Sequence, residues 1–108
     1  MRTLPIPVTR ALRKLGSDIK DARRRRRLPM SIVMQRASIS EPTLIRIERG
    51  DSKVAIGSYA TVLFVLGMAD RLADLVDPRN DAVGLQLEEE NLPKRIRGAS
   101  KQKSPREK

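Results

Sequence analysis

Apolar residues recur at spacings of three and four along much of the chain, in short segments that turn-forming residues separate. This spacing places apolar side chains on one face of an α-helix, whereas a half-buried strand requires strict alternation. The first such stripe consists of Leu12, Leu15, Ile19 and Ala22 and predicts a helix over about residues 9–27. We therefore expect an all-α fold, and 108 residues allow one compact domain with one modest core.

Two short helices are expected next, each bounded by a residue that favours a helix end. Pro29 suits the first turn of a helix that reaches about Ala37, because its missing N–H would have no partner there. Ser40 is placed as the N-cap of a third helix over Glu41–Arg49, and Gly50 provides a left-handed stop.

The fourth and fifth expected helices carry more apolar surface than the first three. The fourth begins near Ile56–Ser58 and has almost no polar face, so it must be buried on all sides. The fifth covers about residues 69–76. We expect a subunit interface formed by Phe64, Val65, Leu72, Leu75 and Val76; the alternative is that the fourth helix lies at the centre of a five-helix core.

The two ends of the chain are predicted to lack stable structure. Residues 1–8 contain Pro5 and Pro7 and are expected to form a flexible, extended arm. Residues 98–108 consist mainly of Lys, Ser, Gln, Arg, Glu and Pro, a composition typical of a disordered basic tail.

Between these parts, residues 77–97 form a short extension. Val83–Leu87 alternates as a strand would, but the helix formers Glu88–Glu90 that follow favour a helix. The apolar residues Val83, Leu87 and Leu92 predict a surface for the dimer or a partner protein. The basic residues 94–97 could fold back onto the preceding carboxylates, reach an acidic groove on a partner, or touch DNA nonspecifically.

Charge is segregated along the sequence. Residues 1–53 contain 14 Lys and Arg and 5 Asp and Glu, a net charge of +9, whereas residues 54–92 carry −5 and residues 93–108 carry +6. A small domain whose amino-terminal half is so basic is typical of a polyanion binder, because neutralising phosphates releases condensed counterions. Nucleic acid is the expected partner.

The composition also argues against catalysis. The chain has no Cys and no His, which removes the usual metal ligands, thiol nucleophiles and imidazole bases. We expect no enzymatic activity, no metal and no cofactor. The longest apolar stretch, Tyr59–Ala69, is too short to span a bilayer, so a soluble, intracellular protein without membrane contact is expected.

The outward face of the third helix is the most informative pattern. Leu44 and Ile47 form its inward stripe, while Glu41, Pro42, Thr43, Ile45 and Arg46 face away from it. Arg can bond guanine bidentately and a Thr or Ile methyl can meet thymine, which favours a major-groove reader; the alternative is an ordinary surface helix. The run Arg23–Arg27 is either a solvated helix end, favoured by the helix dipole, or a phosphate contact.

Two short helices are joined by a tight turn, and the chain from Ser40 onward has the sequence S-E-P-T-L-I-R-I-E-R-G. In these features residues 15–76 resemble the helix-turn-helix domain of the Xre and lambda-repressor family. The resemblance implies a five-helix fold whose third helix enters the major groove. By the same resemblance, Met30, Ser31 and Ser40 lie at the DNA backbone, and Glu41, Pro42 and Arg46 read bases. Thr43, Arg49 and Lys53 match positions that usually touch phosphate.

The rest of the sequence resembles a subgroup of this family. Three segments carry this resemblance: residues 55–75, D-P-R-N-D-A-V-G-L-Q-L from Asp77, and L-P-K-R-I-R from Leu92. They are similar to HipB-like antitoxins encoded beside HipA-type kinase toxins. This implies a cytoplasmic, nucleoid-associated homodimer that represses its own operon at a palindromic operator and binds the toxin. The alternatives are a stand-alone phage-type or metabolic regulator without a toxin, and a protein-binding adaptor without DNA activity.

Overall fold

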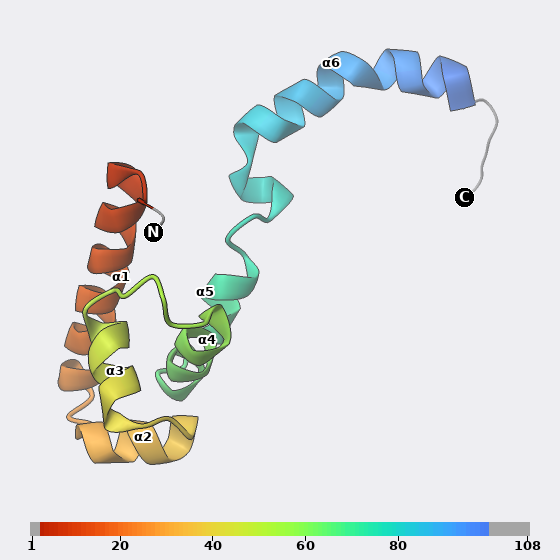
Figure 1. Ribbon diagram of the computed structural model, residues 1–108. Coiled ribbons are helices and arrows are strands. Elements are labelled where there is room, and N and C mark those ends of the chain that lie inside the picture. Colours follow the sequence, from red (N-terminus) through yellow and green to blue (C-terminus); the bar gives the residue numbers. More distant parts are fainter. Residues whose placement is uncertain (1–2, 100–108) are drawn as a thin grey trace. The chain divides into compact units, whose positions relative to one another are not determined.

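The computed structural model describes residues 3–99, with side chains described for residues 3–91. All regular structure in this range is helical, as the sequence predicts (Figure 1). The elements in chain order are α1 (Ile6–Arg25), α2 (Met30–Ala37), α3 (Glu41–Glu48), α4 (Ile56–Val65), α5 (Ala69–Ala73), the 3₁₀ helix η1 (Pro78–Asn80) and α6 (Ala82–Ala99). The chain divides after Leu72 into two compact units.

Helix α1 begins earlier than the sequence predicts. Residues 1–8 were expected as an extended arm, but the helix starts at Ile6, with Pro5 as its N-cap and Pro7 in its first turn. A proline in the first turn gives up only an N–H that has no helical partner, so it supports a helix start there. The expected arm is therefore wrong from Ile6 onward.

The carboxyl end of α1 also differs slightly from the prediction. The helix ends at Arg25 and not at Arg27, which adopts a left-handed conformation with φ of 53°. The N–H of Leu28 then bonds the carbonyl of Arg23 at 3.1 Å, which closes the turn. Three basic residues occupy the last turn of α1, where the helix dipole favours them.

Helices α2 and α3 follow their predicted bounds to within one residue. Ser38 ends α2 in a left-handed conformation with φ of 56°, and its successor Ile39 donates its N–H to the carbonyl of Met34 at 3.0 Å. Ser40 caps α3 as predicted, since its side chain accepts the N–H of Thr43. A tight turn of three residues thus joins two helices of 8 residues each.

The core of the first unit gathers residues from α1, α2, α3 and α4. Leu44, Ile47 and Val33 are fully buried, and α3 supplies two of them. The remaining buried apolar residues are Ile19, Ala22, Ala37, Tyr59, Val62 and Leu66. The inward positions of Ile19 and Ala22 in the first predicted stripe, and of Leu44 and Ile47 in the third helix, are therefore confirmed, while Leu12 and Leu15 are half-buried.

Helices α1 and α3 approach each other at two glycines. A β-carbon at Gly16 would lie 2.5 Å from the backbone nitrogen of Gly50 and 2.6 Å from the carbonyl oxygen of Ile47. Gly50 itself has φ of 73°, and a β-carbon there would strike the Leu12 carbonyl. Only glycine suits both positions, because the two backbones meet without intervening side chains.

Within one chain α4 is not enclosed on all sides, so the alternative of a central helix in a five-helix core is wrong, and the subunit interface predicted to cover its open face stays a prediction. It buries Tyr59 and Val62, while Ile56 and Phe64 are 71% and 70% exposed. A helix of 10 residues on a small core can bury one face, and its other face stays open within a single chain. Helix α5 is shorter than expected, ending at Ala73 and not at residue 76.

The second unit contains η1 and α6, each started by an aspartate. Asp77 accepts the N–H of Arg79 at 2.8 Å, and Asp81 accepts the N–H of Gly84 at 3.0 Å. Residues 83–90 are helical, so the favoured alternative is confirmed and the strand is excluded. Helix α6 continues to Ala99, beyond the expected tail boundary at Gly98, and residues 100–108 lie outside the described part of the chain.

We expect Gly16→Ala to lower the free energy of unfolding by about 1–3 kcal/mol, because the new methyl group overlaps backbone atoms that cannot rotate away. Gly57→Ala is the matched control, since nothing lies within 4 Å of a β-carbon there. That change should stabilise the protein by roughly 0.5 kcal/mol through helix propensity. Urea denaturation followed by circular dichroism measures both, and equal effects would contradict the close backbone contact.

Candidate nucleic-acid interface

The exposed face of α3 lies opposite its two buried residues. Glu41, Pro42 and Arg46 are exposed, while Thr43 and Ile45 are half-buried. Leu44 and Ile47, on the other side, are fully buried. The helix therefore has one fixed orientation, and its outward side chains are those that the sequence predicts.

The amino terminus of α3 is held by its own side chains. The hydroxyls of Ser40 and Thr43 lie 3.0 Å apart, and the N–H of Thr43 approaches the Ser40 oxygen at 3.4 Å. Both residues are predicted DNA contacts. Their hydroxyl oxygens can still accept or donate a further bond, since each hydroxyl has one donor and two acceptor sites.

The loop after α3 is shaped by Asp51 and Tyr59. The Asp51 carboxylate accepts the N–H of Lys53 at 2.7 Å, and the Asp51 carbonyl accepts the phenolic O–H of Tyr59 at 2.7 Å. Burial, with a smaller contribution from the nearby Asp51 charge, raises the pKa of the Tyr59 hydroxyl above its usual value. The phenol therefore remains a hydrogen-bond donor at neutral pH and anchors the loop that carries Lys53.

This loop, α3 and the start of α4 border an open hollow of about 600 Å³. Its lining consists of Thr43, Arg46, Asp51, Lys53, Val54, Ala55 and Ser58. Three predicted contact residues from two elements, Thr43, Arg46 and Lys53, thus share one concave surface. Two cations and one carboxylate line it, a balance that favours an anionic ligand.

Other predicted contact residues lie outside this hollow. Glu41 and Pro42 are exposed at the start of α3, and Ser31 is exposed in the first turn of α2. Met30 is half-buried and packs against the core. Arg49 is the C-cap of α3 and lines a second hollow.

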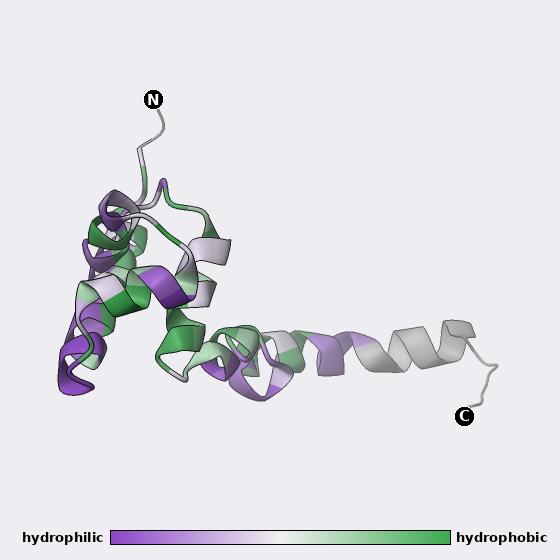
Figure 2. Cartoon of the chain, turned by 90° about the horizontal axis from the view of Figure 1, so that it is seen from below, coloured by the Kyte–Doolittle hydropathy of each residue, from purple (hydrophilic) through white to green (hydrophobic). Residues whose placement is uncertain are grey.

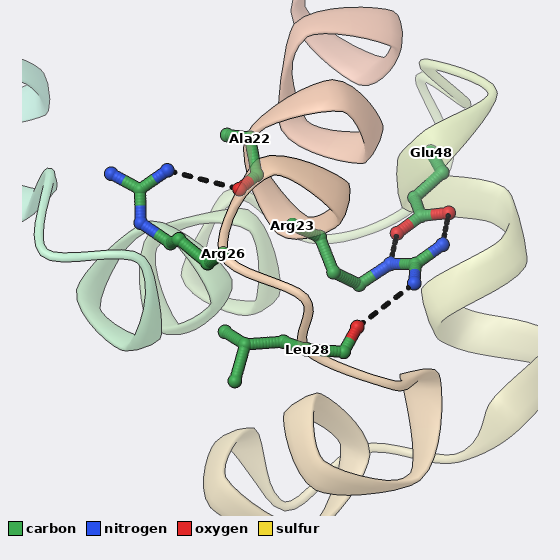
Figure 3. A network of polar contacts seen from close by, with 5 residues as sticks. All are labelled: Ala22, Arg23, Arg26, Leu28 and Glu48. Carbon is green, nitrogen blue, oxygen red and sulfur yellow. Dashed lines mark hydrogen bonds and ion pairs between the residues drawn. The ribbon is translucent and has the colours of Figure 1, made fainter.

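Arg23 is neither the solvated helix end nor the phosphate contact that the arginine run suggests. It is buried, and its guanidinium makes a two-pronged ion pair with Glu48, at 2.6 Å from Nε and 3.1 Å from Nη2 (Figure 3). Its Nη1 also donates to the Leu28 carbonyl at 3.1 Å. Arg23 therefore joins α1 to the end of α3, and the expectation that it is solvated or touches phosphate is wrong.

Arg24–Arg27, by contrast, are exposed. Arg26 donates to the Ala22 carbonyl at 2.9 Å, as Figure 3 shows. The two interpretations of the run stay open for these residues.

The buried ion pair has a signal in the sequence that composition alone does not provide. Arg23 follows Ile19 by four residues and Glu48 follows Leu44 by four, so each charge continues an apolar stripe. Opposite charges on two stripes that face the same core are candidates for pairing, because a lone buried charge is very costly. The hydrogen bond of Tyr59 has no comparable sequence signal, because its acceptor is a backbone carbonyl, which every residue has.

The residues predicted for a dimer or partner surface differ in exposure. Of the five residues predicted for a subunit interface on the fourth and fifth expected helices, three are exposed: Phe64, Leu75 and Val76. Val65 packs partly against the core and Leu72 is half-buried. In α6, Val83 and Leu87 are exposed, and the described part of this helix mixes hydrophobic and hydrophilic residues (Figure 2). The side chain of Leu92 lies outside the described residues.

The described residues contain no group of three or more carboxylates placed to hold a metal ion. Over the same residues, every helix is too short or too polar to cross a bilayer. No family model, curated protein or solved structure matches the chain.

We expect Glu48→Ala to lower the free energy of unfolding by about 3–5 kcal/mol, because it leaves the Arg23 guanidinium buried without a counter-charge. The double variant R23M/E48L should recover most of this loss, since it removes both desolvated charges together. Lys14→Ala, which breaks an exposed ion pair with Asp18, should change little. Thermal denaturation of the three variants checks this, and a mild effect of Glu48→Ala would contradict a structural role for the pair.

Proposed function

We propose that the protein is a sequence-specific DNA-binding repressor, in which α2, the turn and α3 act as a helix-turn-helix. The observation that carries this proposal is the exposed face of α3, which continues into a hollow lined by Thr43, Arg46 and Lys53. In the proposed complex α3 lies in the major groove, with Arg46 at base edges and Lys53 at the phosphates.

The packing of α3 supports this role. Leu44 and Ile47 are buried and Glu48 is held by Arg23, so the helix cannot rotate about its axis without breaking the core. A reading helix needs such a fixed orientation, because base contacts depend on side chains placed within a fraction of an ångström. The high positive charge of residues 1–53 adds long-range attraction to DNA.

The proposed operator is palindromic and the proposed active form is a two-fold dimer. One recognition helix reads only a half-site, and the exposed Phe64 of α4 offers apolar surface to a second copy. Half-sites should then lie roughly 34–36 Å apart, about one helical turn of DNA.

Selection of binding sequences from a random pool, combined with sedimentation of the complex, tests the repressor proposal. We expect inverted repeats with that spacing and two protein chains per site. Selection of no sequence would contradict the repressor, and a monomer bound to a single unrepeated site would contradict the dimer.

The toxin partner is the finer part of the proposal and rests on the resemblance to HipB-like antitoxins. Helix α6 presents exposed Val83, Leu85 and Leu87 beside the acidic Glu88–Glu90, a surface that phosphates would repel. A kinase-type toxin encoded by the neighbouring gene is the proposed occupant of this surface.

Truncation after Val76 tests the toxin proposal. The core lies entirely within residues 15–68, so we expect operator binding to persist if the dimer does, while co-purification with the neighbouring gene product falls sharply. Undiminished co-purification would move the partner site onto the first unit. A neighbouring gene unrelated to kinases would favour the stand-alone regulator.

Arg46 and Lys53 should differ in what their loss does to DNA binding. Arg46→Ala should cost about 1–3 kcal/mol on the operator and relax discrimination at one base pair, because Arg46 is exposed in the last turn of α3, on the face proposed to meet the bases. Lys53→Ala should weaken binding to all sequences alike and reduce the salt slope by about one, because it neutralises one phosphate. Equal losses on operator and random DNA for both variants, measured by fluorescence anisotropy, would refute base reading by Arg46.

A further inference from the structure

We propose that the second hollow, between the amino-terminal half of α1 and the end of α3, binds one phosphate group of the DNA backbone through Arg13 and Arg49. The hollow has a volume of about 420 Å³. Its lining consists of Thr3, Leu4, Thr9, Leu12, Arg13, Arg49, Gly50, Asp51 and Ser52. This inference rests on the proposed function and adds Arg13 to it as a contact that the sequence pattern does not indicate.

The close glycine contact places these two arginines on the same hollow. Gly50 directly follows Arg49, and a β-carbon at Gly50 would strike the Leu12 carbonyl and lie 2.7 Å from the backbone nitrogen of Arg13. The backbones at Arg13 and Gly50 are thus in contact, and in Figure 1 the segment after α3 crosses α1 before it turns toward α4. The packed backbone therefore brings the two arginines to the same hollow.

The chemistry of the lining suits a singly charged phosphodiester. Two guanidiniums and the Asp51 carboxylate give a net charge of +1, and one carboxylate oxygen already accepts the N–H of Lys53. Both arginines are exposed, and neither forms an ion pair within the described residues. The hydroxyls of Thr9 and Ser52 add donors for phosphate oxygens, and Arg binds phosphate with two parallel N–H bonds.

The position of the hollow relates it to the proposed interface. Arg49 caps the carboxyl end of α3, and Asp51 lines both this hollow and the one that holds Arg46 and Lys53. When a helix lies in the major groove, phosphates line the groove on either side of its end. The phosphate bound here lies beside the bases read by α3, so α1 extends the footprint of each half-site.

Inorganic phosphate tests the site without any assumption about DNA. In the full chain we expect a saturable phosphate-dependent shift of the Arg13 and Arg49 Nε–H signals in ¹H–¹⁵N spectra. Arg13→Ala should abolish the shift at Arg49, whereas Lys14→Ala, which removes the same charge from the adjacent exposed position, should preserve it. Absence of a saturable shift, or its survival in Arg13→Ala, would overturn the site.

DNA binding tests whether the site serves the proposed function. Arg13→Ala should reduce the slope of log affinity against log salt by about 0.9, the value for one lost phosphate contact, and should do so equally on operator and random DNA. Lys14→Ala should leave the slope within error. If the wild-type chain binds no DNA, the proposed function fails while the phosphate titration still decides the site. If it binds DNA and Arg13→Ala leaves the slope unchanged, the inference is wrong and the proposed function stands.

Discussion

The contact between the backbones of α1 and α3 is the constraint on which the rest of the first unit depends. Gly16 lets the end of α3 rest directly on α1, and Gly50 lets the chain turn away immediately afterwards. Helix α3 has only 8 residues, too few to be stable alone in water. Its order comes from this contact, from the buried Leu44 and Ile47, and from the Ser40 cap.

The ion pair between Arg23 and Glu48 also holds α1 against α3, but burying its two charges costs desolvation energy. Both side chains are almost fully buried, with relative exposures of 11% and 7%. Desolvating two charges offsets most of their attraction, so the pair contributes more to the uniqueness of the packing than to net stability. A two-pronged guanidinium bond is directional, so it adds to the register that the buried Leu44 and Ile47 already impose on α3.

Local signals in the sequence predict the parts of the fold that local interactions determine. Pro29, Ser40 and Gly50 mark the bounds of α2 and α3 because capping and left-handed turns depend on a few neighbouring residues. The exposed face of α3 follows from the same stripe, so most of the candidate contact residues are predictable. That these residues bind DNA, and that a toxin binds α6, stay predictions.

The errors arise where distant segments decide the outcome. Arg23 lies in a run of five arginines that looks uniform, and only the approach of Glu48 separates it from its neighbours. The alternative that places α4 at the centre of a five-helix core fails because a chain of this size cannot build enough core around that helix. The early start of α1 has another cause. Pro7 is compatible with either an extended arm or a first helical turn, and the sequence alone does not decide between the two.

The bond from Tyr59 to the Asp51 carbonyl gives the molecule a built-in spectroscopic reporter. The chain has one Tyr and no Trp, so near-ultraviolet absorption and intrinsic fluorescence report mainly on this phenol. Its hydroxyl is attached to the loop that carries Lys53 and that borders both hollows. Any ligand that moves this loop alters the environment of the phenol, and the emission of the unlabelled protein registers the event.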